Sequence, residues 1–156
     1  METAFIQSPL GITKIVGDEN GIAVISVLSE GEITKNIPKQ LQVCVNQLQE
    51  YFEGRRHEFD FKLNPQGTDF QQKVWQELVN IPFGKTISYL DLSKKLGDVK
   101  AIRAVASANG RNPLWIVVPC HRVIGTDGSL TGYAGGLWRK KWLLEHESPS
   151  KQQSLF

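Results

Sequence analysis

Short apolar runs that contain β-branched residues fill the start of the chain. The segments FIQSPLG, ITKIVGD and IAVISVLS are such runs, and DENG at 18–21 supplies Asp, Asn and Gly for a tight hairpin turn. β-branched side chains pack well on a pleated surface, and a tight turn joins neighbouring strands of opposite direction. The pattern predicts an antiparallel sheet.

A helical period replaces the strand pattern in PKQLQVCVNQLQEYF. Its apolar residues recur at helical spacing from Leu41 to Phe52, which predicts a helix with one buried face. Cys44 lies beside this apolar stripe, and the pattern favours a small core residue there over a functional thiol. FDFKLN at 59–64 is predicted to be one further strand, since NPQG breaks the chain after it.

The second half of the sequence has mainly helical patterns. Thr68, with Gln71 three residues later, has the sequence of a capping box. Phe70, Val74 and Leu78 continue one apolar stripe, which predicts that this side of the helix is buried. The Pro and Gly of IPFG then end the helix.

Two short helices are predicted next, in ISYLDLSKKLG and VKAIRAVASANG. The tight connection GD joins them and the second is rich in Ala and Ser, so the pair has the form of a helix-turn-helix. Small residues on the second helix would let its backbone approach a partner closely. Many helical pairs of this form bind nothing, so the pattern alone does not decide for DNA binding.

Charge is distributed unevenly along the chain. Residues 1–84 hold 7 Lys and Arg against 11 Asp and Glu, whereas residues 85–142 hold 10 against 3. A basic segment is expected where a polyanion such as nucleic acid binds, although a solvated basic face gives the same count. We place a domain boundary near Gly67. The chain is then an α+β protein with a small antiparallel-sheet domain and a helix over 1–67, and a mainly helical domain over 68–156.

The composition is ordinary for a globular protein. Of the 156 residues, 40% are hydrophobic and 22% are charged, and the chain is long enough to bury a core. The N-terminus METAFIQSPLG has no basic region leading into an apolar one, and LWIVVP is too short to span a bilayer. With two cysteines, a disulfide framework is not expected. These features predict a cytoplasmic protein with reduced thiols and no membrane association.

The stretch VVPCHRVIG carries the candidate chemistry. Cys120 is an inert buried thiol, a metal ligand or a nucleophile. A metal site is disfavoured because no second Cys or His has finger-like spacing, and His57 and His146 are isolated. His121, Arg122 and the basic surroundings favour the thiolate form, so the sequence predicts a nucleophile with a lowered pKa.

The adjacency of Cys120 and His121 sets a geometric condition. Neighbouring side chains of a strand point to opposite faces, so the two need either a turn at the cysteine or a bridging water. Pro119 favours a strand that ends there and a turn that begins. His121 also needs an acceptor that orients its ring. In GGLWRKKWLLEHE, Glu147 shares the inward face of two leucines and is the candidate, with a frayed surface position as the alternative.

These residues match a known family. The segment NGRNPLWIVVPCHRVIGTDGSLTGYAGGLWRKKWLLEHE closely resembles the active-site region of the O6-alkylguanine-DNA alkyltransferases, also called methylated-DNA:protein-cysteine methyltransferases. The resemblance runs from Thr68 to Glu147. The Pro-Cys-His-Arg-Val signature carries it, together with the upstream asparagine, arginine and tyrosine. The N-terminal part resembles the supporting domain of the family in the order of its elements.

The resemblance implies a single-turnover reaction in DNA repair. Cys120 would accept the alkyl group of O6-alkylguanine or O4-alkylthymine irreversibly, and His121 would deprotonate it through a water. Glu147 would orient His121. Tyr89 would reach the flipped guanine and help to neutralise it as it leaves, while Asn112 would brace the turn that carries the cysteine.

The resemblance also implies how DNA is bound. A monomer would bind double-stranded DNA through the minor groove, and Arg103 would enter the base stack in the place of the flipped base. The further residues expected at the DNA are Lys94, Lys95, Lys100, Ala104 and Arg111. The residues expected around the guanine are Pro119, Val123, Tyr133 and Ala134. Some relatives have a serine where this chain has Ala134, so a side-chain contact is lost there while the backbone amide stays.

Two other classes of protein stay open on the residues alone. A non-catalytic lesion binder of the alkyltransferase-like type has a similar fold and groove but lacks the cysteine, so Cys120 argues against it. A redox or thiol-hydrolase protein with a Cys-His pair would need a resolving Cys or an oxyanion-hole motif, and neither is evident. No metal, nucleotide or other cofactor is expected.

Overall fold

The computed structural model describes residues 1–130, 133 and 135–148. The chain forms two compact units: residues 1–66 with 113–117 make the first, and residues 67–112 with the described residues from Val118 onward make the second. The chain therefore leaves the second unit after Asn112 and returns to it at Val118. No helix among the described residues is long and apolar enough to cross a membrane.

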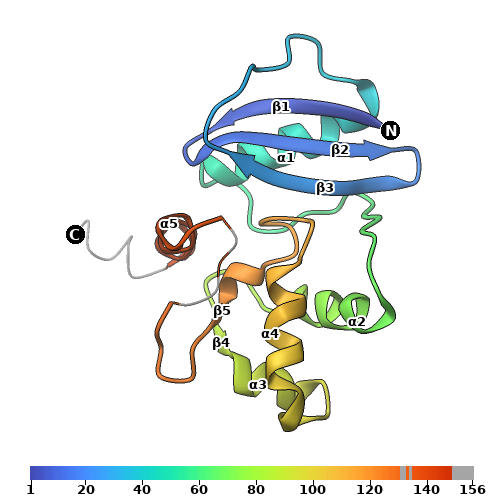
Figure 1. The fold of residues 1–156 in the computed structure, drawn as a ribbon. Helices are drawn as coiled ribbons and strands as arrows, with labels where there is room; N and C mark the ends of the chain where they lie inside the picture. The colour runs from blue at the N-terminus through green and yellow to red at the C-terminus, as the bar shows by residue number, and fades with distance from the viewer. Residues whose placement is uncertain (131–132, 134, 149–156) are drawn as a thin grey trace, which may run out of the picture. The chain divides into compact units, whose positions relative to one another are not determined.

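An antiparallel sheet forms the first unit, as the sequence predicts. Strands β1 (Glu2–Ser8), β2 (Gly11–Asp18) and β3 (Gly21–Leu28) follow one another in the order β1-β2-β3 (Figure 1). The register pairs Ile15 with both Ala4 and Ile25, and all three side chains are buried. Alternating burial along each strand gives the sheet one core face.

Two short segments cover the outer edge of β3. The backbone N–H of Ile22 donates to the Lys62 carbonyl at 2.9 Å, and that of Ile25 donates to the Pro113 carbonyl at 2.8 Å. The strand predicted over 59–64 is wrong, because only one bridge forms there, between Ile22 and Leu63. The rings of Phe59 and Phe61 pack in an aromatic cluster with α1 instead of continuing the ladder.

A helix packs on this sheet and completes the core of the first unit. A 3₁₀ turn η1 (Lys39–Leu41) leads into α1 (Gln42–Phe52), which is coloured cyan in Figure 1. The predicted apolar stripe is buried at Leu41, Val45 and Leu48. Cys44 is 1% exposed, which confirms it as a core position.

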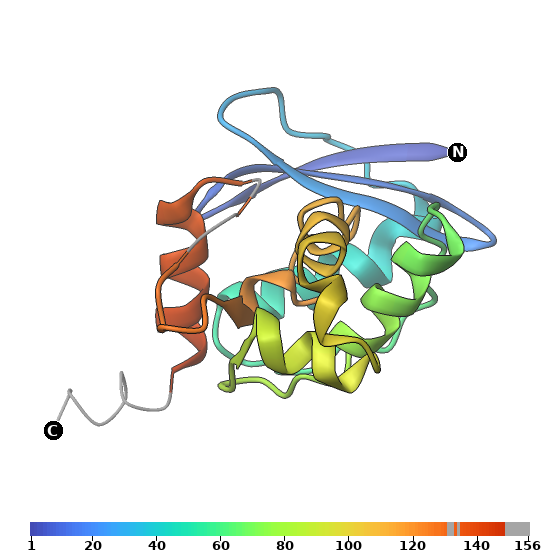
Figure 2. The same cartoon turned by 60° about the horizontal axis from the view of Figure 1, so that its bottom comes forward.

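The second unit is mainly helical, as predicted. Its elements are α2 (Asp69–Leu78), α3 (Tyr89–Lys95), a 3₁₀ turn η2 (Val99–Ala101), α4 (Ile102–Gly110), a 3₁₀ turn η3 (Cys120–Arg122) and α5 (Leu137–Glu147). Two short parallel strands, β4 (Ile87–Ser88) and β5 (Val123–Ile124), join α3 to the segment after the cysteine. Figure 2 shows α4 against both α2 and α3.

Local sequence signals set the ends of these helices. Thr68 and Gln71 form the predicted capping box at the start of α2. Val74 and Leu78 are buried as predicted, but Phe70 of the same stripe is 39% exposed, because it lies in the first turn, where the helix end faces solvent. The predicted helix-turn-helix pair is present. Gly97, at φ 91°, makes the left-handed bend between α3 and α4.

Residues 113–117 belong to the first unit, and they link α4 of the second unit to the turn that carries Cys120. Asn112 donates its side-chain N–H to the Val118 carbonyl at 2.7 Å and so closes the two ends of this excursion. Inside it, Ile116 has φ 72°, a left-handed conformation that β-branched residues rarely adopt. Ile116 is 1% exposed, so packing holds the strained backbone in place.

Candidate active site

Cys120 begins a 3₁₀ turn and does not continue a strand. Its N–H donates to the Val118 carbonyl at 2.8 Å, and the N–H of Arg122 donates to the Pro119 carbonyl at 3.0 Å. The chain therefore turns at the cysteine, as Pro119 leads one to expect. The Cys120 residue is 7% exposed, so the thiol lies at the edge of the protein interior.

The neighbouring His121 is held by a carboxylate. Its Nε2 lies 2.7 Å from Oε2 of Glu147, and both side chains are buried. The Glu147 carboxylate also accepts from Arg122, at 2.8 Å from Nε and 3.0 Å from Nη2. Glu147 therefore faces inward and contacts His121, as expected. The alternative, a frayed surface position for Glu147, does not agree with this geometry.

Glu147 stays ionised in this setting. Burial raises the pKa of its carboxyl, but the hydrogen bonds and charges of His121 and Arg122 outweigh burial and hold the pKa well below its usual range. The Nη1 of Arg122 donates to the Ile81 carbonyl at 2.7 Å, so the guanidinium has fixed partners on two sides. The α5 helix is thereby tied to the turn of the cysteine.

His121 is neutral, and one of its nitrogens is bare. Burial lowers the pKa of the imidazole against the opposing effect of Glu147. Because a carboxylate only accepts, the Nε2 that faces it carries the proton, and Nδ1 keeps its lone pair. Within the described part of the chain, Nδ1 is buried and has no hydrogen-bond partner. The ring is thus oriented as a base.

The prediction of a lowered pKa for Cys120 is wrong. Burial raises the pKa of the thiol and outweighs the hydrogen bond of Asn112, the charge of Lys140 and a backbone hydrogen bond of Cys120, which lower it. Arg122, which the sequence analysis counted in favour of the thiolate, is engaged by Glu147. The basic count of the segment therefore overstates the positive charge available to the sulfur. The resting group is a neutral thiol.

Lys140 is a site residue that the sequence analysis missed. It is fully buried, and its Nζ donates to the Val123 carbonyl at 2.7 Å and lies 5.9 Å from the ring centroid of Tyr89. Lys140, Leu143 and Glu147 share one face of α5 at spacings of three and four. That spacing was a usable signal, because it places a lysine on the same inward stripe as Glu147.

Two further residues expected at the site, Tyr89 and Asn112, lie at the start of α3 and just after α4. Tyr89 begins α3 and is 9% exposed, and burial raises the pKa of its phenol. Asn112 hydrogen-bonds the Cys120 thiol as well as the Val118 carbonyl. A second asparagine, Asn109, also contacts this group and had no place in the sequence analysis.

The residues expected at DNA lie on the surface of the second unit. Arg103 and Ala104 are exposed on the first half of α4. The basic residues around them that are also exposed are Lys94, Lys95, Lys100 and Arg111. The buried Arg122 and Lys140 do not belong to this surface. Of the residues expected around the guanine, Pro119 and Val123 are buried and Tyr133 is half-buried, while Ala134 lies outside the described residues.

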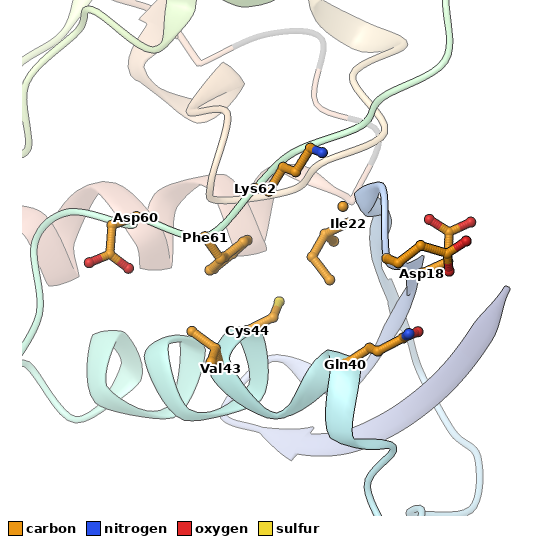
Figure 3. A pocket seen from close by; sticks show the side chains of 10 residues that line it. Asp18, Ile22, Gln40, Val43, Cys44, Asp60, Phe61 and Lys62 are labelled. Carbon is orange, nitrogen blue, oxygen red and sulfur yellow. The ribbon is translucent and has the colours of Figure 1, made fainter.

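The first unit has a cavity of its own. It has a volume of about 340 Å³ and is lined by residues that include Asp18, Asp60, Lys62 and Cys44 (Figure 3). Burial raises the pKa of Cys44 to about 12, so this thiol is unreactive at neutral pH. Carboxylates at the cavity do not suit a polyanion.

The second unit combines a cysteine beside an oriented base with a helix-turn-helix that carries exposed basic residues. These features define a protein that takes a chemical group from DNA. The DNA binding domain of 6-O-methylguanine DNA methyltransferase matches residues 69–149, and the ribonuclease-like domain of the same protein matches residues 1–65. The chain belongs to the 6-O-methylguanine DNA methyltransferase family.

Individual relatives agree over nearly the whole chain. A methylated-DNA--protein-cysteine methyltransferase from Methanosarcina barkeri is 44% identical and covers 91% of this chain and 94% of its own. One from Mycobacterium tuberculosis is also 44% identical, over 91% and 89%. The crystal structure of Mycobacterium tuberculosis OGT in complex with DNA superposes with a TM-score of 0.86 at 41% identity, covering 100% of both chains.

Proposed function

We propose that this chain repairs alkylated DNA by moving an alkyl group from O6 of guanine to Sγ of Cys120. The relatives named above carry names for this type of reaction. The observation that supports it best is the imidazole of His121, the residue that follows Cys120: Glu147 holds one ring nitrogen, and the other is buried with no hydrogen-bond partner among the described residues. Such a base suits a thiol that burial keeps protonated.

Proton removal is the first step of the proposed reaction. Nδ1 of His121 takes the thiol proton of Cys120 through one bridging water, and the charge of Glu147 stabilises the imidazolium that forms. Asn112 and the buried ammonium of Lys140 favour the thiolate, so they offset part of the cost of burying it. The thiolate, which is the active nucleophile, therefore forms only when the reaction takes place.

Alkyl transfer follows as a displacement. The S–C bond forms on the alkyl carbon while the C–O6 bond breaks, and the electron pair passes to the guanine. Tyr89 donates its hydroxyl hydrogen to the leaving base. Main-chain groups near Val123 and from Tyr133 to Ala134 hold the base, and Pro119 shapes the site. O4-alkylthymine presents the same ring carbon–oxygen–alkyl arrangement and is a second substrate.

The base has to leave the duplex before it can meet Cys120, because an O6-alkyl group cannot be approached in line within the stack. Arg103 fills the vacated place, and the small Ala104 lets α4 lie close to the narrow minor groove. Exposed Lys94, Lys95, Lys100 and Arg111 bind phosphates, which gives affinity without base-sequence specificity. One monomer acts at each lesion.

Residues 68–156 are assigned the DNA-binding and alkyl-acceptor role, and residues 1–67 a supporting role. The product S-alkylcysteine is a thioether without a carbonyl for water to attack, so the protein acts once and needs no cofactor. Both cysteines are free thiols, which fits the cytoplasm as the expected compartment. The lesion-binder alternative is set aside because the acceptor thiol is present.

Stoichiometry tests the proposal. With excess O6-methylguanine duplex, methyl transfer should stop at about one equivalent per chain, because the chain has one activated thiol. Peptide mass measurement should find the methyl group on Cys120 and none on Cys44. Cys120→Ala should abolish transfer while duplex affinity changes less than tenfold. Sustained turnover with Cys120 recovered free would instead support a hydrolase.

A further inference from the structure

Asn109 joins three elements of the active site through one amide group. It lies in the last turn of α4 and is 1% exposed. Its Nδ2 is 3.4 Å from the hydroxyl oxygen of Tyr89, at the start of α3, and 3.3 Å from the carbonyl oxygen of Cys120. The residue therefore contacts the proposed proton donor and the backbone of the proposed acceptor together.

The chemistry of these partners fixes which way the amide points. A backbone carbonyl only accepts, so the atom facing Cys120 has to be the NH₂ group of Asn109. The same nitrogen then has its second N–H for the Tyr89 oxygen. The amide oxygen Oδ1 is buried and has no hydrogen-bond partner within the described residues. An unpaired buried oxygen destabilises the fold. The oxygen therefore does not explain why an amide lies here, and the two N–H contacts do.

This arrangement acts on the hydroxyl hydrogen of Tyr89. A phenol oxygen carries one hydrogen and accepts on its remaining lone pairs. The N–H of Asn109 occupies an accepting position, so the phenol hydrogen has to point in another direction. Burial raises the pKa of Tyr89 and the Asn109 bond opposes that rise, so the phenol is protonated at neutral pH yet a better donor than an isolated buried phenol.

We propose that Asn109 is a positioning residue that directs the Tyr89 hydroxyl hydrogen to the leaving guanine. This inference rests on the proposed function, in which Tyr89 serves the departing base. As the S–C bond forms and the C–O6 bond breaks, the purine gains the electron pair and the proton of Tyr89. After the guanine leaves, the phenolate takes a proton from solvent and the His121 imidazolium releases to solvent the proton that it received from Cys120, so the protein gains and loses no net proton beyond that of the thiol.

A double-mutant cycle with Tyr89 tests this link. Single-turnover benzyl transfer from free O6-benzylguanine would be measured for Asn109→Ala, Tyr89→Phe and the double variant. Asn109→Ala should slow transfer about tenfold on its own and less than about twofold in the Tyr89→Phe background, because contacting groups that act together are not additive. Asn109→Asp should also be slow, since a carboxylate would draw the Tyr89 hydrogen to itself.

A second reagent separates proton donation from damage to the cysteine. Benzyl bromide delivers the same benzyl group, but its bromide leaves without a proton. Mass measurement of the Cys120 peptide should show that Asn109→Ala keeps the wild-type rate with benzyl bromide within about twofold. Gln47→Ala is the matched control, because Gln47 is a buried helix amide of the first unit that binds Asp60. It should lower stability and change neither rate.

Several outcomes would overturn the inference. Equal losses with O6-benzylguanine and benzyl bromide would mean that Asn109 acts through the backbone of Cys120. Additive effects with Tyr89→Phe would mean that it does not act through the phenol. A Tyr89→Phe variant as fast as wild type would remove the proposed role of Tyr89 itself, whatever Asn109 does. If Asn109→Ala does not fold, the same rates with O6-benzylguanine and benzyl bromide would be compared for Asn109→Asp and Asn109→Ser.

Discussion

Replacing Glu147 by Gln removes one negative charge from a buried cluster and leaves the size of the side chain unchanged. The carboxylate is 3% exposed and accepts from His121 and from two nitrogens of Arg122. A glutamine can accept on one atom only, and its NH₂ group would face the donors of Arg122 or His121. Arg122, which is 6% exposed, would then be a buried cation without its anion.

Removing one partner of a buried ion pair costs about 3–5 kcal/mol, because the remaining charge has neither solvent nor counterion. We therefore expect Glu147→Gln to lower the free energy of unfolding by about 3–5 kcal/mol, and the melting temperature by roughly 6–20 °C. In the fraction that stays folded, His121 loses the anion that stabilises its protonated form. Benzyl transfer from O6-benzylguanine should fall about 10²-fold.

Urea unfolding and single-turnover transfer, both at neutral pH, measure the two effects. Glu145→Gln is the control on the same helix, because Glu145 is 61% exposed and forms a surface ion pair with Lys141, at 4.0 Å. Loss of such a surface pair costs less than about 1 kcal/mol. If Glu147→Gln cost no more than Glu145→Gln, the buried carboxylate would not hold the cluster together. A transfer rate equal to wild type would refute its action through His121.

Three further results are expected. Arg103→Ala should slow repair in duplex DNA far more than transfer from free O6-benzylguanine, because a free base needs no flipping; equal losses would contradict the stack-filling role. Lys100→Ala should mainly weaken duplex binding and reduce the salt slope by about one, as a titration at several salt concentrations would show. Because the folded pKa of Glu147 is depressed, its stabilisation is complete above the ordinary pKa of about 4.3 and is lost as pH falls; acid unfolding of Glu147→Gln should therefore depend less on pH.

The sequence predicts most of the fold because its local signals are strong. The β-branched runs and the DENG turn give the antiparallel sheet, and Thr68 with Gln71 gives the start of α2. The segment 113–117 could not be placed in this way. Its pairing with Ile25 is a long-range backbone contact, and nothing in PLWIV specifies which strand edge it meets. The predicted strand at 59–64 failed for a related reason, since its aromatic rings found partners on α1.

The sequence predicted the contact between Glu147 and His121, and it did not predict the electrostatics of the candidate site. Residue type and inward spacing were enough to bring Glu147 to His121. The pKa of Cys120 depends on burial, which a count of nearby basic residues does not contain, so its direction came out reversed. Lys140 was missed because it lies among basic residues of a kind that is usually exposed. Asn109 gave no signal because its hydrogen bonds join three elements that meet only in the folded chain.

The pairing of residues 113–117 with β3 also affects synthesis on the ribosome. The first unit looks N-terminal, yet the backbone groups of Ile25 meet Pro113 and Trp115, which are made more than half a chain later. The sheet edge stays open until those residues leave the exit tunnel, so the first unit cannot finish folding before residues 67–112 of the second unit have been made. A nascent chain stalled before residue 113 should remain sensitive to protease along β3. A fragment that ends near residue 67 should be sensitive to protease at the same strand.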